Sequence, residues 1–374
     1  MTSPARSVFK YFYFPAVIFL IAFLVFTLQD SHGWAGWALM LFFLMLSFGF
    51  RSNKVLKGFV FTTLILSAVS LAMYHPSYFQ TLGTLKTTAL IIPAMQVIMF
   101  GMGTELSLKD FADVLKMPKA VLIGIVCHYT IMPLVGFGVA HLFNFPPEVA
   151  AGIILVGCCP SGLASNVMCY LAKANLALSV TVTAVSTLAA PLFTPLLMKL
   201  LAGQLIEVNF MKMVWDITEI VIIPIVAGLI FHYIVRGKFK WLDKAMPYLS
   251  MIGIGIVLVV ITADKSEALK QVGLILLIAT LIHNLGGFFL GYWSARLLKM
   301  PEKDARTIAL EVGMQNAGLA AGLAKAMGVM LAGLAPAVFG VVMNLSGSIL
   351  ANWWHNKDPE APRSKKKEKE IAVS

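Results

Sequence analysis

Residues 156–164 read VGCCPSGLA, and residues 312–320 read VGMQNAGLA. The two stretches share the skeleton VG…GLA and lie 156 positions apart. Each interrupts a long apolar segment with glycine and polar residues. Interrupted membrane helices at corresponding positions of two repeats are typical of secondary transporters, whose substrate and ion sites lie where the interrupted helices meet. The pair therefore predicts both an architecture and the place of its binding site.

The composition indicates a membrane protein. Hydrophobic residues make up 59% of the 374 residues, charged residues only 13%, and the mean hydropathy is +0.84. A soluble chain carries about 25% charged residues. We therefore predict an all-α polytopic membrane protein with a single compact membrane domain. Runs long enough to cross a bilayer predict about twelve transmembrane helices, over residues 12–28, 34–50, 56–74, 87–104, 119–143, 148–172, 175–200, 209–235, 246–263, 271–297, 303–327 and 330–354.

The basic residues predict the orientation of these spans. One set of alternate loops, which includes both termini, holds 23 of the 29 Lys and Arg residues. Because cytoplasmic loops are enriched in Lys and Arg, we expect a multi-pass protein of the cell (inner) membrane with both termini in the cytoplasm. The same asymmetry explains the net charge of +11 without a nucleic-acid partner. A basic tail over 357–374, expected to be disordered, can also contact anionic lipid.

Further landmarks recur with a constant offset. His128 and His283 are 155 positions apart, as are Pro146 and Pro301. We therefore predict two repeats of five spans each, over about 56–202 and 203–356, within a symporter domain of residues 56–356. Because five is odd, the second repeat enters the membrane inverted relative to the first. Residues 1–55 lie outside the repeat and are expected to form a transmembrane hairpin extension.

The interruptions themselves have a physical rationale. Pro160 removes a backbone N–H group and clashes with the preceding turn, and Gly162 weakens the helix further. Irregular backbone within a bilayer persists only where protein or bound ions satisfy it. The freed carbonyl groups are hard oxygen ligands, which favour an ion site at the break. A proline kink without a ligand is the alternative.

Glu311 is the strongest single candidate for a cation ligand. A charged side chain at this depth costs about 3 to more than 10 kcal/mol unless it is partnered, and no basic residue lies within one helical turn of it. A bound cation is one explanation, and a protonated carboxyl group without a function is the other. Ser179 and Thr183 share one helix face. With Ser165, Asn166, Gln315 and Asn316 they offer only oxygen ligands, which suit a hard cation rather than a transition metal, although such residues also stabilise ordinary helix contacts.

Several stretches resemble the bile acid:sodium symporter family, including its bacterial members. They are FGMGTELSLKDF (100–111), the segment 155–197 that begins LVGCCPSGLASN, LEVGMQNAGLAAGLA (310–324) and NLSGSILA (344–351). The resemblance covers about residues 56–355. It implies ten helices in an inverted repeat, divided into a panel domain and a core domain that rock against each other, with two broken helices that cross in the core.

The resemblance also implies site residues. A first sodium site would use Ser165, Asn166, Ser179, Thr183 and Glu311. A second would use Glu311 again with oxygens of Val312, Met314 and Gln315, and Asn316 would face the substrate. The resemblance thus implies one or two sodium ions as the coupled ions, and we expect no transition metal or organic cofactor.

This chain departs from the family pattern at the second sodium site. His128 stands where bacterial relatives have a glutamine that completes it. An imidazole nitrogen is a poor sodium ligand, and histidine titrates near physiological pH. Transport coupled to protons or to a single sodium ion is therefore an alternative to two-sodium coupling. A histidine that is only hydrogen-bonded within its span is the structural alternative.

The expected substrate pocket departs from the pattern as well. Leu163 replaces a hydroxyl residue after the glycine of the first break, and Met343 replaces a histidine before Asn344. We include all three residues with Asn316 among the candidate substrate contacts. Because polar contacts are lost, a bile acid is not assumed, and the expected partner remains a small organic anion.

The sequence thus predicts a symporter that imports an organic anion with sodium by alternating access, as a monomer. A ligand sensor that binds without transporting is an alternative. An enzyme is not expected, because no Ser/His/Asp or metal motif is present. The four cysteines lack both metal-ligand spacing and a disulfide pattern, so packing explains them.

Overall fold

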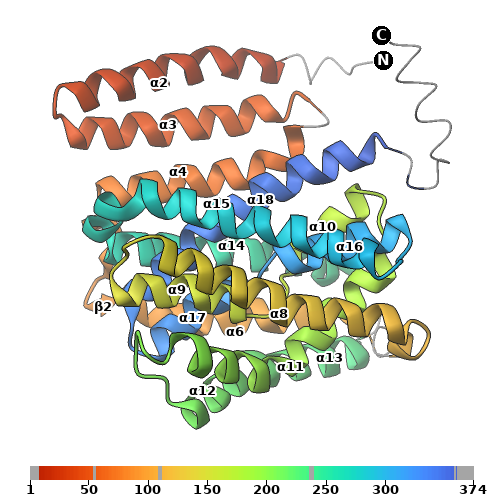
Figure 1. The fold of residues 1–374 in the computed structure, drawn as a ribbon. Coiled ribbons are helices and arrows are strands. Elements are labelled where there is room, and N and C mark those ends of the chain that lie inside the picture. Colours follow the sequence, from red (N-terminus) through yellow and green to blue (C-terminus); the bar gives the residue numbers. More distant parts are fainter. Residues whose placement is uncertain (1–7, 54–55, 108–111, 236–239, 358, 360–374) are drawn as a thin grey trace.

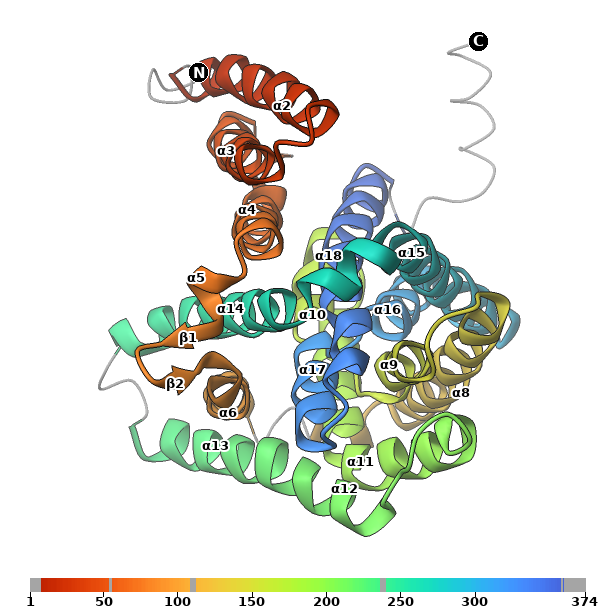
Figure 2. The same ribbon diagram turned by 90° about the vertical axis from the view of Figure 1, so that its left-hand side faces the viewer.

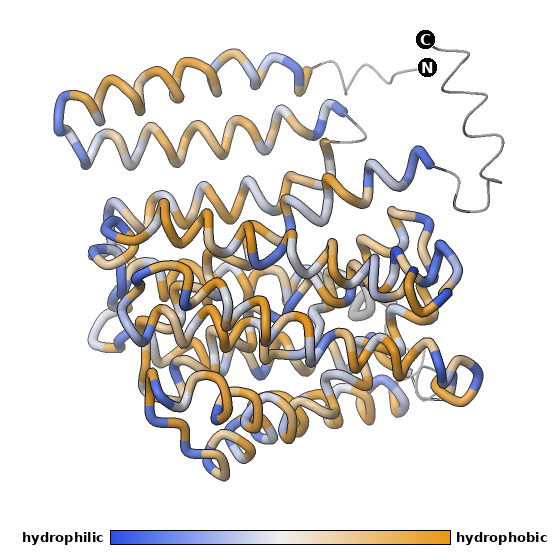
Figure 3. The backbone as a smooth tube through the Cα atoms, viewed as in Figure 1, coloured by the Kyte–Doolittle hydropathy of each residue, from blue (hydrophilic) through white to orange (hydrophobic). Residues whose placement is uncertain are grey.

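The computed structural model describes residues 8–53, 56–107, 112–235, 240–357 and 359, and these residues are almost entirely helical. Eight helices are long and apolar enough to cross a membrane, and three shorter apolar helices accompany them. Apolar residues run along the helices while polar residues gather at helix ends on two opposite sides of the molecule (Figures 1 and 3). The chain is therefore a polytopic membrane protein. The count of twelve spans stays a prediction.

The elements follow one another along the chain with short connections. The helices are α2 (Tyr13–Leu28), α3 (His32–Phe50), α4 (Val60–Tyr74), α5 (Ser77–Gln80), α6 (Ile91–Glu105), α8 (Pro118–Leu142), α9 (Pro147–Cys158), α10 (Ala164–Leu171), α11 (Leu176–Ala202), α12 (Phe210–Ile217), α13 (Ile223–Val235), α14 (Lys240–Asp264), α15 (Ser266–Leu297), α16 (Glu302–Gly313), α17 (Ala317–Ala326) and α18 (Leu334–His355). Two short strands, β1 (Thr81–Leu82) and β2 (Leu85–Lys86), pair antiparallel.

Long helices pack into two groups. The panel group contains α4, α6, α13 and α14, and the core group contains α8 to α11 and α15 to α18. Glycines let panel helices touch backbone to backbone: a Cβ atom added at Gly103 of α6 would lie 2.2 Å from the carbonyl oxygen of Ile225, just inside α13. Small residues commonly allow such close approach between membrane helices. Figure 2 shows the panel group (α4, α6, α13 and α14) on the left and lower left, and the core group to its right.

Helices α2 and α3 form a hairpin that packs against α4 mainly through α3 (Figure 2), while the ring of Phe23 on α2 meets that of Tyr74 edge-to-face. The contact is close, because a Cβ atom at Gly36 would lie 2.3 Å from Cβ of Tyr74. Two hydrogen bonds cross it: Ser67 Oγ donates to Met40 O over 2.8 Å, and His75 Nε2 lies 2.9 Å from Gly33 O. The hairpin is thereby fixed to the outer face of a panel helix.

Two of the expected spans are each divided into two helices. Residues 148–172 form α9 and α10, and residues 303–327 form α16 and α17. Helices α9 and α16 each contain 12 residues, and their N-caps are Pro146 and Pro301. Non-helical residues 159–163 and 314–316 separate the half-helices. Apart from residues 357 and 359, the tail expected over 357–374 lies outside the described residues.

We predict that Gly36→Leu loosens the hairpin from α4. The added side chain has no room against Tyr74, and overpacking of this kind costs about 1–3 kcal/mol. Thermal unfolding of the detergent-solubilised protein should therefore begin at a lower temperature. Gly138→Leu on α8 is the matched control, because a Cβ there meets nothing within 4 Å. Equal melting temperatures for the two variants would contradict the packing described here.

Candidate cation and substrate site

The two breaks pair with each other through their backbones. Gly162 N–H donates to Met314 O over 3.0 Å, and Asn316 N–H donates to Pro160 O over 2.8 Å. Ser161 and Gln315 thereby form an isolated antiparallel β-bridge inside the helical protein. Backbone groups that the half-helices cannot satisfy internally are satisfied by the opposite break, which a bilayer interior requires.

Side chains from neighbouring helices satisfy further carbonyl groups. Thr194 Oγ1 on α11 donates to Cys158 O over 2.7 Å, and Asn284 Nδ2 on α15 donates to Gly313 O over 2.8 Å. Cys158 and Gly313 are the last residues of α9 and α16, where helix carbonyls lose their intrahelical partners. Each broken helix is therefore held at its end by a polar side chain from an adjacent helix.

Glu311 lies just before the second break and is completely buried, at 0% exposure. Ser165 Oγ and Ser179 Oγ each lie 2.5 Å from Oε1 of the carboxylate, and Thr183 Oγ1 lies 2.8 Å from Oε2. Asn166 Oδ1 accepts from Ser179 Oγ over 2.7 Å. The structure thus brings together five residues from α10, α11 and α16 that are far apart in sequence.

The three hydroxyl groups that contact Glu311 face more acceptors than they have hydrogens. Ser165, Ser179 and Thr183 supply one hydroxyl hydrogen each. Those three hydrogens face both carboxylate oxygens of Glu311, Asn166 Oδ1 and the carbonyl oxygen of Gly162, to which Ser165 lies 2.8 Å away. A surplus of oxygen acceptors around an ionised carboxylate favours a cation, and oxygen ligands suit a hard one.

His128 bridges the two breaks from α8. Its Nδ1 atom lies 3.0 Å from Glu311 O and its Nε2 atom 2.9 Å from Cys159 O. The side chain is fully buried. Both ring nitrogens therefore face carbonyl oxygens. The imidazole ring thus occupies backbone oxygens near which a cation at the expected second site would have to bind.

The remaining expected ligands of that second site follow Glu311 in the chain, at the end of α16 and in the second break. Gln315 Nε2 donates to Val312 O over 2.7 Å, while its Oε1 atom is buried without a hydrogen-bond partner among the described residues. Met314 O already accepts from Gly162 N–H and from Ser161 Oγ, which lies 3.2 Å away. Among the described residues of this set, Gln315 Oε1 is the side-chain oxygen that has no hydrogen-bond partner. The second set is therefore less complete than the set around Glu311.

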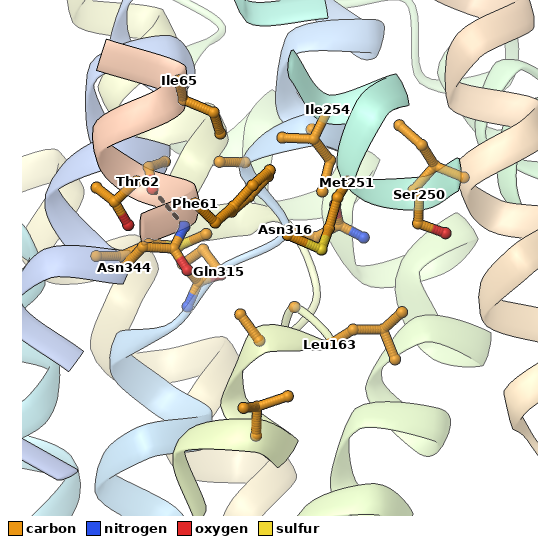
Figure 4. Close-up of a pocket in the computed structure, with 18 of the residues that line it drawn as sticks. Phe61, Thr62, Ile65, Leu163, Ser250, Met251, Ile254, Gln315, Asn316 and Asn344 are labelled. Atoms are coloured by element: carbon orange, nitrogen blue, oxygen red, sulfur yellow. Dashed lines mark hydrogen bonds between the residues drawn. The ribbon is translucent and has the colours of Figure 1, made fainter. Parts of the chain in front are cut away.

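A cavity of about 330 Å³ opens between the panel and core groups, next to the paired breaks. Leu163, Asn316, Met343 and Asn344, the four expected substrate contacts, all line it. Phe61 of α4 and Met251 of α14 extend toward the break that carries Asn316 (Figure 4). The lining is mostly apolar, as ligand pockets usually are.

One acidic side chain and the start of a helix contribute charge or partial charge to the cavity. Among the described lining residues, Glu105 carries the single charged side chain. The start of α17 also lines the cavity, at Ala317 and Gly318, and helix N-termini attract anionic groups. Asn316 Oδ1 caps this helix by accepting from Leu319 N–H over 3.0 Å, which leaves its amide nitrogen as the group able to donate to a ligand.

The sequence reasoning did not identify Ser161, Thr194 or Asn284. All three are polar residues in apolar spans, which is a detectable signal, but Ser and Thr in such spans usually bond to their own helix. Their partners are carbonyl groups at the breaks. The choice of those partners depends on helix packing that the sequence does not display.

Comparison with known proteins gives a consistent result. Residues 92–272 match the model of the Sodium Bile acid symporter family. The chain is 46% identical over 261 residues to a Bacillus subtilis protein described as the uncharacterized sodium-dependent transporter YocS, with 70% of this chain and 81% of that protein covered. The chain belongs to the sodium bile acid symporter family. The resemblance inferred from the sequence is thereby confirmed.

Plant relatives of this symporter family member are similar over much of its length. One is the probable chloroplastic sodium/metabolite cotransporter BASS1 of Arabidopsis thaliana, 36% identical over 270 residues, with 72% of this chain and 67% of the relative covered. The rice protein of the same name is 35% identical over 300 residues, with 80% and 73% covered. The family is one of sodium-dependent transporters, which points away from an enzyme.

We predict that Gly162→Val separates the two breaks. A Cβ atom at Gly162 would lie 2.7 Å from the carbonyl oxygen of Gln315, so the β-bridge cannot form without displacing backbone. Sodium-dependent thermal stabilisation, measured against choline, should weaken by at least about tenfold in sodium concentration, or about 1.4 kcal/mol. Gly138→Val, which meets no neighbour, should retain it. If the Gly162→Val variant responds to sodium normally, the bridge is not needed for ion binding.

Proposed function

We propose that this protein is a secondary active symporter that imports a small organic anion with sodium by alternating access. The observation that carries the proposal is the completely buried Glu311 carboxylate surrounded by hydroxyl and amide oxygens beside the paired breaks. Membership of a sodium-dependent transporter family supports it. In this proposal the panel and core groups move relative to each other and expose the cavity to alternate sides.

The topology is part of the proposal. Residues 56–202 and 203–356 would be the two inverted repeats, residues 1–55 an added hairpin, and both termini cytoplasmic in the cell membrane. The equal lengths of α9 and α16 and their shared proline N-caps support the repeat. The transporter would act as a monomer, since each chain holds a complete set of oxygen ligands and its own cavity.

Sodium would bind first, at Ser165, Asn166, Ser179, Thr183 and Glu311. Its charge would offset that of the carboxylate, and its coordination would use oxygen atoms that lack hydrogen donors. Because Ser165 and Asn166 lie on α10, Ser179 and Thr183 on α11 and Glu311 on α16, one ion would hold three helices together. The backbone of the second break would then be fixed in the form that receives the substrate.

The substrate would occupy the cavity that Leu163, Asn316, Met343 and Asn344 help to line. Its carboxylate would lie against the start of α17, where the backbone partial charge is positive, and Asn316 Nδ2 would donate to it. Its apolar part would contact the aromatic and aliphatic side chains of α4 and α14. The apolar lining at Leu163 and Met343 favours an anion with few hydroxyl groups over a heavily hydroxylated one.

His128 argues for one sodium ion rather than two. A second ion would use oxygens of Val312, Met314, Gln315 and Glu311, and His128 contacts the carbonyl group of Glu311 there. Its ring supplies nitrogen where sodium needs oxygen. One sodium with one monovalent anion would move no net charge, whereas two sodium ions would gain about 2.3 kcal/mol per 100 mV of membrane potential. Proton coupling through His128 is the alternative.

We predict that Glu311→Gln removes sodium coupling. The amide keeps the size of the side chain but lacks the charge that makes a cation favourable. Binding of radioactive sodium to the purified protein should fall to background, and sodium-driven uptake of organic anions into proteoliposomes should cease. Glu148→Gln, in the first turn of α9, is the control and should change neither. Normal sodium binding by Glu311→Gln would exclude this carboxylate as the coupling group.

We also predict that His128→Gln raises the number of sodium ions bound. Glutamine would place a side-chain oxygen where the imidazole ring lies, next to the carbonyl groups of Glu311 and Cys159, and Oε1 of Gln315 has no hydrogen-bond partner of its own. Equilibrium binding of radioactive sodium should therefore rise from one ion per chain to two. A count that stays at one in a folded variant would mean that His128 only holds the two breaks together.

A further inference from the structure

Asn284 joins the second break to a wall of the substrate cavity. It lies in α15 and is completely buried. Its Nδ2 atom donates to Gly313 O over 2.8 Å, and its Oδ1 atom accepts a short hydrogen bond from Ser346 Oγ on α18. A carboxamide has both donor and acceptor groups, so one side chain can connect the two elements.

The two ends of this connection lie at different sites. Gly313 stands between Val312 and Met314, and its carbonyl group ends the half-helix that carries Glu311. Ser346 does not line the cavity itself, but its neighbours Asn344 and Ser348 do. The hydrogen bonds therefore run from the backbone beside the cation cluster to the helix that lines the substrate cavity.

The first break lacks this arrangement. Cys158, the corresponding last residue of α9, accepts from the hydroxyl group of Thr194. A threonine hydroxyl has a single hydrogen, which this bond uses. At the second break the donor is an amide whose oxygen is free to accept a further bond, and Ser346 provides it. The Asn284 side chain therefore contacts both the end of the half-helix that carries Glu311 and α18.

Ser346 has a choice of acceptors. Its hydroxyl oxygen also lies 2.7 Å from Val342 O in its own helix, and its one hydrogen can serve either that carbonyl group or Asn284. When the hydrogen goes to Asn284, α18 is tied to the second break. When it goes to Val342 O, α18 is released from the break. Packed elements with two discrete arrangements are what allow one site to bias another.

We propose that Asn284 is a positioning residue that transmits the state of the cation-binding break to α18, with Ser346 as its contact on that helix. The proposal rests on the sodium-coupled function proposed above. When sodium fixes the break, Gly313 and Asn284 hold Ser346, and α18 presents Asn344 to the cavity in the position that suits the substrate. Without sodium the break is less restrained and α18 is released.

The test uses a cysteine reporter in the full-length protein. Asn344→Cys places a thiol on the cavity wall, while the four native cysteines are at most 7% exposed. We expect sodium, compared with potassium, to change the rate of maleimide labelling of this thiol by at least about threefold. Radioactive sodium binding by each variant is measured in parallel, so that ion binding and transmission are read separately.

The two relay variants should differ in a defined way. Ser346→Ala keeps the bond between Asn284 and Gly313, so sodium should bind within about threefold of the parent affinity while its effect on labelling disappears. Ser346→Thr keeps the hydroxyl group and should retain that effect. Asn284→Ala leaves a buried carbonyl group unpaired, which costs about 1–3 kcal/mol. It should therefore both weaken sodium binding, by at least about fivefold, and abolish the labelling response.

Thr280→Val is the matched control. Thr280 lies one turn earlier on α15 and is buried, but its hydroxyl group bonds only to Leu276 O and Leu277 O of its own helix. It should behave like the parent. A labelling response that persists in Ser346→Ala, or that is absent from the parent despite sodium binding, would overturn the relay. Absence of sodium binding in the parent would instead contradict the proposed function.

Discussion

The need to pair every backbone group inside a bilayer governs this structure. Two helices end within the protein, and the carbonyl and N–H groups that they release would each cost several kcal/mol if left unpaired. The breaks solve this by pairing with each other around Ser161 and Gln315 and by recruiting side chains from α8, α11 and α15. Because each break depends on the other, the four half-helices form one mechanical unit.

Glu311 is the buried acidic group of that unit, and it can attract a cation. The hydroxyl hydrogens of Ser165, Ser179 and Thr183 cannot serve both carboxylate oxygens, Asn166 Oδ1 and Gly162 O at the same time. A protein that needed only stability would avoid an acidic group here, since a buried carboxylate without a counter-charge is costly. The cluster is therefore better explained by a cation that comes and goes than by packing. Binding and release of that cation would change the cohesion of helices that also border the substrate cavity.

The sequence predicted the membrane class, the family and the residues that the structure gathers around Glu311. It could do so because Pro160 and Gly162 act locally on the backbone, and because the spacing of Ser179 and Thr183 fixes their common helix face. It did not predict that both nitrogens of His128 contact carbonyl groups, or that Asn284 and Thr194 hold the helix ends. Those contacts join residues up to 183 positions apart and depend on how helices rotate and pack.

The departures from the family pattern share one consequence. The resemblance implies that His128 stands in place of an oxygen ligand at the second site and that Leu163 and Met343, which line the cavity, stand in place of polar residues. A transporter that binds fewer cations gains less free energy from ion coupling to offset the desolvation of a polar substrate. An apolar substrate, which an apolar cavity would accept, needs less free energy for its desolvation. In the proposed mechanism, a single coupled ion and a cavity with few polar contacts would thus be compatible with each other. In the proposed mechanism, the Glu311 cluster is the point at which sodium would act on this chain.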